Sequence, residues 1–160
     1  MANKEQAIIE FLMECPAVAQ NPLFFNFINA KDNNKQIITL ANDKSLNQSY
    51  LDGSVLKRYT FTIVDFKSIT YNALVNVAGK TNENVEDYLD VQGIIDWIQE
   101  QEELKNYPNF GTNYKIQEIK ALTDNPNLNG VDTNTKPSLA KYSISVQVDY
   151  LDNSKVIWNK

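Results

Sequence analysis

The feature that most constrains the fold is a run of strict alternation at residues 141–151. From Tyr142 to Tyr150 every second residue is large and apolar, and the residues between are polar or charged. Successive side chains of a β-strand point to opposite faces, so this run predicts a strand with one core face and one polar face. Residues 57–66 alternate in the same way and predict a second strand. The apolar positions of the first run are Tyr142, Ile144, Val146, Val148 and Tyr150.

Two segments have helical periodicity instead. Residues 3–15 repeat apolar side chains at three- and four-residue spacing, with Asn3 as the predicted N-cap and Pro16 as the end of the helix. Cys15 falls on the apolar face, so we interpret it as a core residue. Residues 84–105 predict one long central helix. Gly93 inside it costs about 1 kcal/mol relative to alanine, which we interpret as close packing against a strand, with packing against another subunit as the alternative.

The remaining segments predict strands joined by loops. Residues 23–29 and 36–41 flank a polar cluster and predict a hairpin, and residues 114–122 predict a strand with a bulge near Glu118 and Ile119. Two polar stretches, residues 42–54 and 124–138, contain turn-forming residues and predict long exposed loops. Residues 71–77 fit either a strand or a structured loop.

These elements predict a single α+β domain over residues 1–160. In it, an antiparallel β-sheet is packed by an N-terminal helix and one long central helix. The length of 160 residues and the 42% hydrophobic content suit one packed core.

Composition excludes several classes of function. Histidine is absent and Cys15 is the single cysteine, so no catalytic pair, metal site or cofactor site is predicted, and we expect no enzyme. The net charge is −5 and Arg58 is the only arginine, which argues against sequence-specific nucleic-acid binding. No apolar run approaches the roughly 20 residues that span a bilayer, so we expect no membrane contact and synthesis in the cytoplasm.

A resemblance to a known family emerges from the second half of the chain. Residues 90–101 (DVQGIIDWIQEQ), 106–110 (NYPNF), 123–132 (TDNPNLNGVD) and 140–151 occur in an order that resembles small bacteriophage tail-terminator and minor capsid (head-tail joining) proteins. The similarity covers roughly residues 55–151 and consists of packing and turn residues. It implies a virion protein at the head-tail junction that caps the head-proximal end of the tail tube as a hexameric ring. Its implied partners are further copies, the tube protein and the head connector.

The interface of such a ring is expected at strand edges and in the two long polar stretches, with exposed aromatic residues as further candidates. Trp97 fits either the edge of the core, which we favour, or an interface anchor, and Trp158 fits either a contact or a short final strand. Another head-tail joining or tube-end component is the nearest alternative function. A ligand- or carbohydrate-binding module, or an enzyme that uses buried carboxylates or tyrosines, belongs to a different class. The predicted interface residues are Asp52, Gly53, Trp97, Asn129, Gly130, Asp132 and Trp158.

Overall fold

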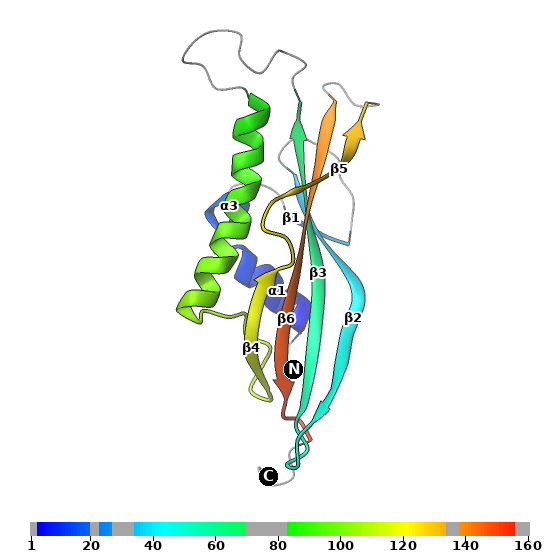
Figure 1. Cartoon of the computed structure of the whole chain (residues 1–160), viewed down its shortest axis with the longest axis vertical. Helices are drawn as coiled ribbons and strands as arrows, with labels where there is room; N and C mark the ends of the chain where they lie inside the picture. Colours follow the sequence, from blue (N-terminus) through cyan, green and yellow to red (C-terminus); the bar gives the residue numbers. More distant parts are fainter. Residues whose placement is uncertain (1–2, 20–22, 27–33, 70–82, 134–137, 156–160) are drawn as a thin grey trace.

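The computed structural model describes residues 3–19, 23–26, 34–69, 83–133 and 138–155, and it is a mixture of helices and one β-sheet (Figure 1). Three helices and six strands are formed by these residues, with more residues in strands than in helices. The predicted segment 71–77 and Trp158 lie outside the described residues.

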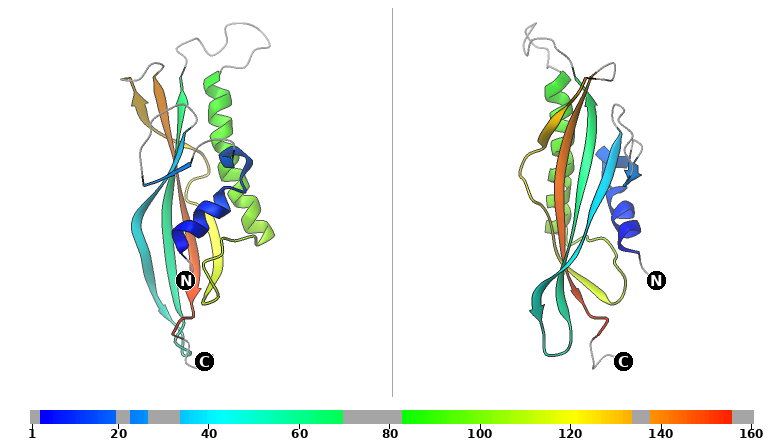
Figure 2. Two further views of the ribbon diagram at one scale, coloured as in Figure 1. Left: turned by 180° about the vertical axis from the view of Figure 1, so that it is seen from behind. Right: turned by 90° about the vertical axis from the view of Figure 1, so that its right-hand side faces the viewer.

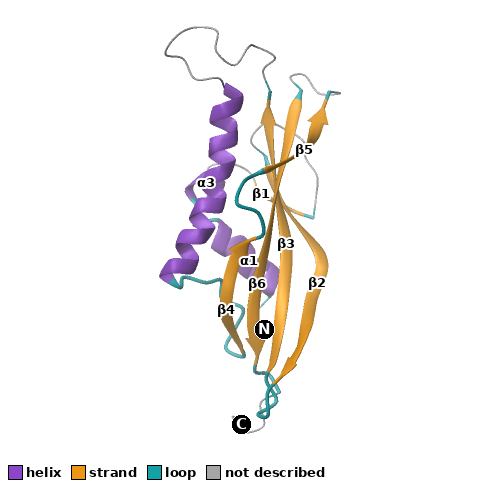
Figure 3. Cartoon of the chain, in the orientation of Figure 1, coloured by secondary structure: helices purple, strands orange, loops and turns teal. Residues whose placement is uncertain are grey.

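The sheet is built around its last strand, β6 (Leu139–Asp152). One side of β6 pairs along its whole length with β3 (Val55–Ser68), and β3 pairs in turn with β2 (Lys35–Ser49), both antiparallel. The other side is shared by two shorter strands: β4 (Tyr114–Ala121) pairs with the second half of β6, and β5 (Asn127–Asp132) pairs with the first half (Figure 3).

The two predicted alternating strands are confirmed as β3 and β6, and their register explains the core. Phe61 faces Val146 and Ile63 faces Ile144, so the apolar positions of both strands share one face of the sheet. The prediction of a wholly polar second face is only partly right. Val64, Phe66 and Leu139 form a second, smaller buried cluster there, while Arg58 pairs with Asp149 further along the same face.

The predicted helices are confirmed, with one addition. Helix α1 (Lys4–Leu12) begins where Asn3 Oδ1 accepts a hydrogen bond from Gln6 N at 3.2 Å. Pro16 does not merely follow this helix, because it opens a second short helix, α2 (Pro16–Ala19). Proline suits the first position of a helix, because a backbone N–H at that position has no acceptor within the helix. The long helix is α3 (Glu83–Leu104), and Lys105 just after it has a φ of 55°.

One buried cluster joins side chains of α1 and α3 to the core face of the sheet. Figure 2 shows α1 running across the strands, and the ring of Phe11 lies 4.9 Å from that of Trp97 on α3. Burial of apolar surface on this scale is the main stabilising contribution in a chain of this size. The cluster includes Ile8, Phe11 and Leu12 of α1, Val91, Ile94 and Ile98 of α3, and Tyr59, Phe61, Ile63, Ile144, Val146 and Val148 of the sheet.

The predicted hairpin of residues 23–29 and 36–41 is wrong. Strand β1 (Leu23–Phe25) pairs with the start of β2 in parallel, with Leu23 beside Lys35 and Phe25 beside Ile37. A parallel pair cannot be joined by a tight turn. Strands β1 and β2 therefore do not form a hairpin, although the polar composition of residues 31–34 is typical of a turn.

The two predicted long loops are also wrong, because each contains a strand. Residues 42–49 continue β2 alongside β3, and the true turn covers only residues 50–54. Within 124–138, residues 127–132 form β5 against β6. Both strands form because a neighbouring strand supplies backbone hydrogen bonds, which do not require apolar side chains. Leu128 and Val131 of β5 are exposed, as expected for a strand at a sheet edge.

Two finer predictions have opposite outcomes. The bulge in β4 is confirmed as a register shift between Ile116 and Glu118, next to the predicted position. The interpretation of Gly93 is wrong, because a Cβ placed on it meets no atom within 4 Å. Among the described residues, Gly93 faces open space and does not pack against a strand.

Candidate interaction surfaces

The predicted interface residues do not form one site. Asp52 and Gly53 lie in the turn between β2 and β3, whereas Asn129, Gly130 and Asp132 lie on β5 at the other end of the sheet (Figure 1). Trp97 lies on α3, partly buried against Phe11, which agrees with the favoured core interpretation. The chain therefore presents separate surfaces.

The β2–β3 turn is a well-ordered tip with an exposed apolar side chain. Asp52 Oδ1 accepts hydrogen bonds from Ser54 N at 2.9 Å and Ser54 Oγ at 2.7 Å, and Gly53 adopts a φ of 97°. The Ser54 N–H and hydroxyl hold the pKa of Asp52 below its ordinary value. Leu51 beside them is 98% exposed. Singly exposed apolar residues are common on protein surfaces, so Leu51 alone does not mark a contact.

The β5 edge is irregular. Asn129 is the extra residue of a bulge between Leu128 and Gly130, and its Nδ2 donates to Ser143 Oγ at 2.5 Å. Gly130 has a φ of 143°, a conformation that favours glycine. Bulges of this kind interrupt a sheet edge and turn its side chains outward.

The two long edges of the sheet differ in how they are covered. On β4, Glu102 Oε2 of α3 accepts a hydrogen bond from Ile119 N at 2.9 Å, and the Tyr107 hydroxyl donates to Gln117 O at 3.3 Å. On the opposite edge, no strand in the described part of the chain pairs with β2 beyond Ile37. Among the described residues, β2 is therefore less covered than β4.

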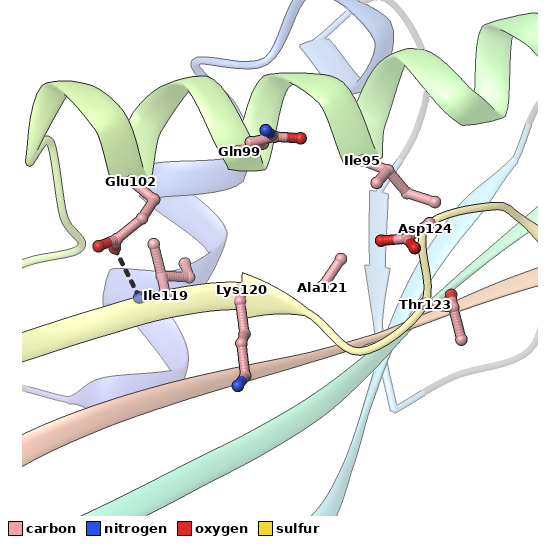
Figure 4. Close-up of a pocket in the computed structure, with 8 residues that line it drawn as sticks. All are labelled: Ile95, Gln99, Glu102, Ile119, Lys120, Ala121, Thr123 and Asp124. Atoms are coloured by element: carbon pink, nitrogen blue, oxygen red, sulfur yellow. Dashed lines mark hydrogen bonds between the residues drawn. The ribbon is translucent and has the colours of Figure 1, made fainter.

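A cleft of about 250 Å³ lies between α3 and β4 (Figure 4). Burial raises the pKa of Glu102, but the hydrogen bonds from Lys105 and from Ile119 N outweigh burial, and the pKa lies below its ordinary value. Glu102 is therefore an ionised acceptor that joins α3 to β4. Figure 4 shows Lys120 directed away from the helix. The lining residues are Ile95, Gln99, Glu102, Ile119, Lys120, Ala121, Thr123 and Asp124.

A buried charge cluster, which the sequence analysis missed, lies where β2, β3 and α3 meet. Lys35 Nζ is 3.4 Å from Asp65 Oδ2. Lys67 Nζ is 3.9 Å from the same oxygen and 2.5 Å from Asp90 Oδ2 on α3. Lys35 and Asp65 are 0% and 1% exposed, and burial raises the pKa of Asp65 to about 6 although both lysines act against it. This cluster ties the helix to the sheet.

A sequence signal for the cluster does exist. Asp65 and Lys67 continue the spacing of Phe61 and Ile63, which places them on the core face of β3. Charged residues on a core face are rare unless they are paired. Their position on that face therefore indicates buried partners, but the partner elements are far away in the sequence.

Arg58, the only arginine, is already engaged. Its Nε and Nη2 donate to the two carboxylate oxygens of Asp149 at 2.7 and 3.0 Å. The two residues are register partners on β3 and β6, and this pairing raises the pKa of Arg58. The carboxylate occupies the Nε–Nη2 side of the guanidinium, so that side is not available for a bidentate contact with a phosphate.

Among the described residues, no group of three or more His, Cys, Asp or Glu side chains is placed to hold a metal ion. Cys15 is buried and unoxidised, and burial raises the pKa of its thiol. In the same part of the chain, no helix combines the length and apolar character needed to cross a bilayer.

No protein-family model and no curated protein matches the chain.

Proposed function

We propose that the chain is a structural component of a bacteriophage tail that closes the head-proximal end of the tail tube as a hexameric ring and offers a docking surface to the head connector. The motifs in residues 90–101, 106–110, 123–132 and 140–151 suggest this family. The proposed subunit is an α+β domain in which the N-terminal and central helices pack against a sheet that is antiparallel except for the pairing of β1 with β2. It acts at the head-tail junction and has no enzymatic activity.

The observation that carries the proposal is the difference between the two sides of the sheet. The outer edge of β2 has no partner strand beyond Ile37 among the described residues, and the other side ends in the bulged, apolar edge of β5. A contact between two different surfaces of identical subunits is a head-to-tail contact, which closes into a ring when its rotation permits. The ordered tip at residues 50–54 lies at the end of the open β2 edge and can meet a third partner.

Proline substitution on β2 tests this assembly. Ile37 O accepts from Asn26 N on the outer side of β2, so alternation directs the N–H of Thr39 to that side as well. Thr39→Pro removes this donor, and an edge strand tolerates proline at such a position. In electron micrographs of chains mixed with assembled tail tubes, we expect rings at tube ends with the wild-type chain and with Thr39→Val, which keeps the N–H, but not with Thr39→Pro.

Thermal unfolding of the three proteins provides the folding control. If a folded Thr39→Pro chain still forms rings like those of the wild type, assembly through the β2 edge is wrong.

A further inference from the structure

A groove of about 400 Å³ separates α2 from the outer side of α3. Its α3 wall includes Leu89, Gly93 and Trp97 together with three acidic residues, and its other wall is the segment 15–17. Leu89 is 57% exposed, and Trp97 is held from behind by the ring of Phe11 at 4.9 Å. The groove therefore offers an apolar floor whose aromatic residue already has a defined position.

Gly93 leaves a small notch in the wall of this groove. No contact among the described residues explains why glycine is present at this position. Glycine in a helix interior is less stable than alanine, and it is usually retained where a neighbour approaches closely. In the part of the chain that the structure describes, no atom lies within 4 Å of the position of a Cβ on Gly93. The missing side chain leaves space at the wall of the groove, which a side chain from another molecule can enter.

The negative charge of α3 indicates which side chains a partner must carry to bind in this groove. The helix carries eight acidic residues and no lysine or arginine. Asp96 and Glu100 are exposed beside the notch, and Asp90, which binds Lys67, is still 43% exposed. A segment that binds here must supply a large apolar side chain for the notch and positive charges for the rim.

One segment of this sequence has that composition. Residues 155–160 read Lys-Val-Ile-Trp-Asn-Lys, with a lysine at each end and an aromatic residue between them. Extended, six residues span roughly 20 Å, enough to place both lysines near the acidic rim while Trp158 enters the notch.

We propose that residues 155–160 of a neighbouring copy dock in the groove between α2 and α3, with Trp158 beside Gly93 and Trp97 and with the lysines facing Asp96 and Glu100. The donor is assigned to another copy because β6 ends near the lower end of the molecule, whereas α2 lies beside the middle of α3 (Figure 1). This inference deepens the proposed self-assembly and rests on it, but it uses a surface separate from the β2 edge.

A peptide of residues 153–160 with a fluorescent label tests the docking directly. The receptor is the full chain carrying Trp158→Ala, so that its own segment does not compete. Binding is followed by fluorescence anisotropy, with a dissociation constant expected in the micromolar range, as for other short peptide contacts. We expect Gly93→Leu to weaken binding at least about tenfold by filling the notch. Gly93→Ala, which fits the open space, serves as the matched control and keeps most of the affinity.

Charge reversal provides a second arm that does not alter the notch. The double substitution Asp96→Lys and Glu100→Lys should weaken binding about tenfold, and raising the salt concentration should weaken binding to the unmodified receptor. A peptide in which Trp158 is replaced by alanine should bind at least about tenfold less tightly. Equal binding by the Gly93→Leu receptor, or no measurable binding of the unmodified peptide, would overturn the inference. Rings that still form when peptide binding is absent would leave the β2 contact standing and remove only this docking site.

Discussion

Asp65 lies on the core face of β3, 1% exposed, between the ammonium groups of Lys35 and Lys67. Local sequence indicates that this position is buried, because it keeps the spacing of Phe61 and Ile63. It does not identify Lys35 or Asp90 as neighbours, since these residues lie on other elements that only the complete fold brings close. Buried ion pairs often add little net stability, but removing one partner is costly.

Asp65 makes the free energy of unfolding depend on pH, and the direction of this dependence follows from its pKa. Burial raises the pKa of Asp65 from 3.8 to about 6, so the folded chain binds this proton more tightly than the unfolded chain. The stability that this proton contributes is present below about pH 4 and is lost as the pH rises through about 6, on the order of 3 kcal/mol. The free energy of unfolding of the wild type, measured with urea relative to Asp65→Asn, should therefore fall between pH 4 and pH 7. A wild type that gains stability over Asp65→Asn in this interval would contradict the assignment.

Gly93 permits a second prediction at the same scale. Alanine at this position adds a methyl group where no atom lies within 4 Å, and it removes the cost of glycine in a helix. Gly93→Ala should therefore raise the free energy of unfolding by up to about 1 kcal/mol. A loss of stability in urea unfolding would mean that the turn is packed after all, as the sequence had suggested.

At the scale of elements, strands β3 and β6 and helices α1 and α3 are visible in the sequence because each buries an apolar face. The outer half of β2 and the whole of β5 are not visible, because they are polar and form through pairing with β3 and β6. The parallel pairing of β1 with β2 is equally hidden, since tertiary position and not local sequence sets strand direction. Polar edge strands are therefore the main reason why the predicted elements differ from the structure. Of the interface residues that were predicted in two long loops, some lie in a tight turn and the others lie on a strand.

Glu102 connects α3 to β4. Substituting it tests whether its carboxylate covers the β4 edge. Its Oε2 accepts from Ile119 N, and Ile119 is fully buried. Glu102→Ala leaves that N–H without an acceptor and should lower the free energy of unfolding by about 1–3 kcal/mol. Glu102→Gln keeps an acceptor oxygen and should cost less. Amide hydrogen exchange at Ile119 should accelerate in the alanine variant only, and unchanged protection there would show that the carboxylate is dispensable.

At the scale of the whole molecule, a buried core maintains the fold, and the exposed surfaces are the ones we propose for assembly. Val146 is 0% exposed at the centre of the sheet, and Leu51 is 98% exposed at the tip. Aspartate at position 146 buries an unpaired charge and should abolish cooperative unfolding, a loss above about 4 kcal/mol. The same residue at position 51 should change stability by less than about 0.5 kcal/mol. Circular dichroism during thermal unfolding measures both, and a stable Val146→Asp chain would mean that the core is misplaced.

Deleting residues 42–54 or 124–138 is not a fair test of assembly, because each deletion removes part of the sheet. Substitutions that leave the strands intact are required instead. Leu51→Asp and Thr39→Pro meet this requirement at the tip and at the β2 edge, and each preserves the apolar core that joins α1 and α3 to β3 and β6.

The most direct measurement of the central claim is electron microscopy of the purified chain mixed with assembled tail tubes of the same virion. The proposed function predicts one ring of six copies at a single end of each tube, with tubes that stop growing once the ring has bound. Free chain can remain monomeric until a tube end is present. Tubes that keep elongating and show no added density at either end, in the presence of folded chain, would contradict it.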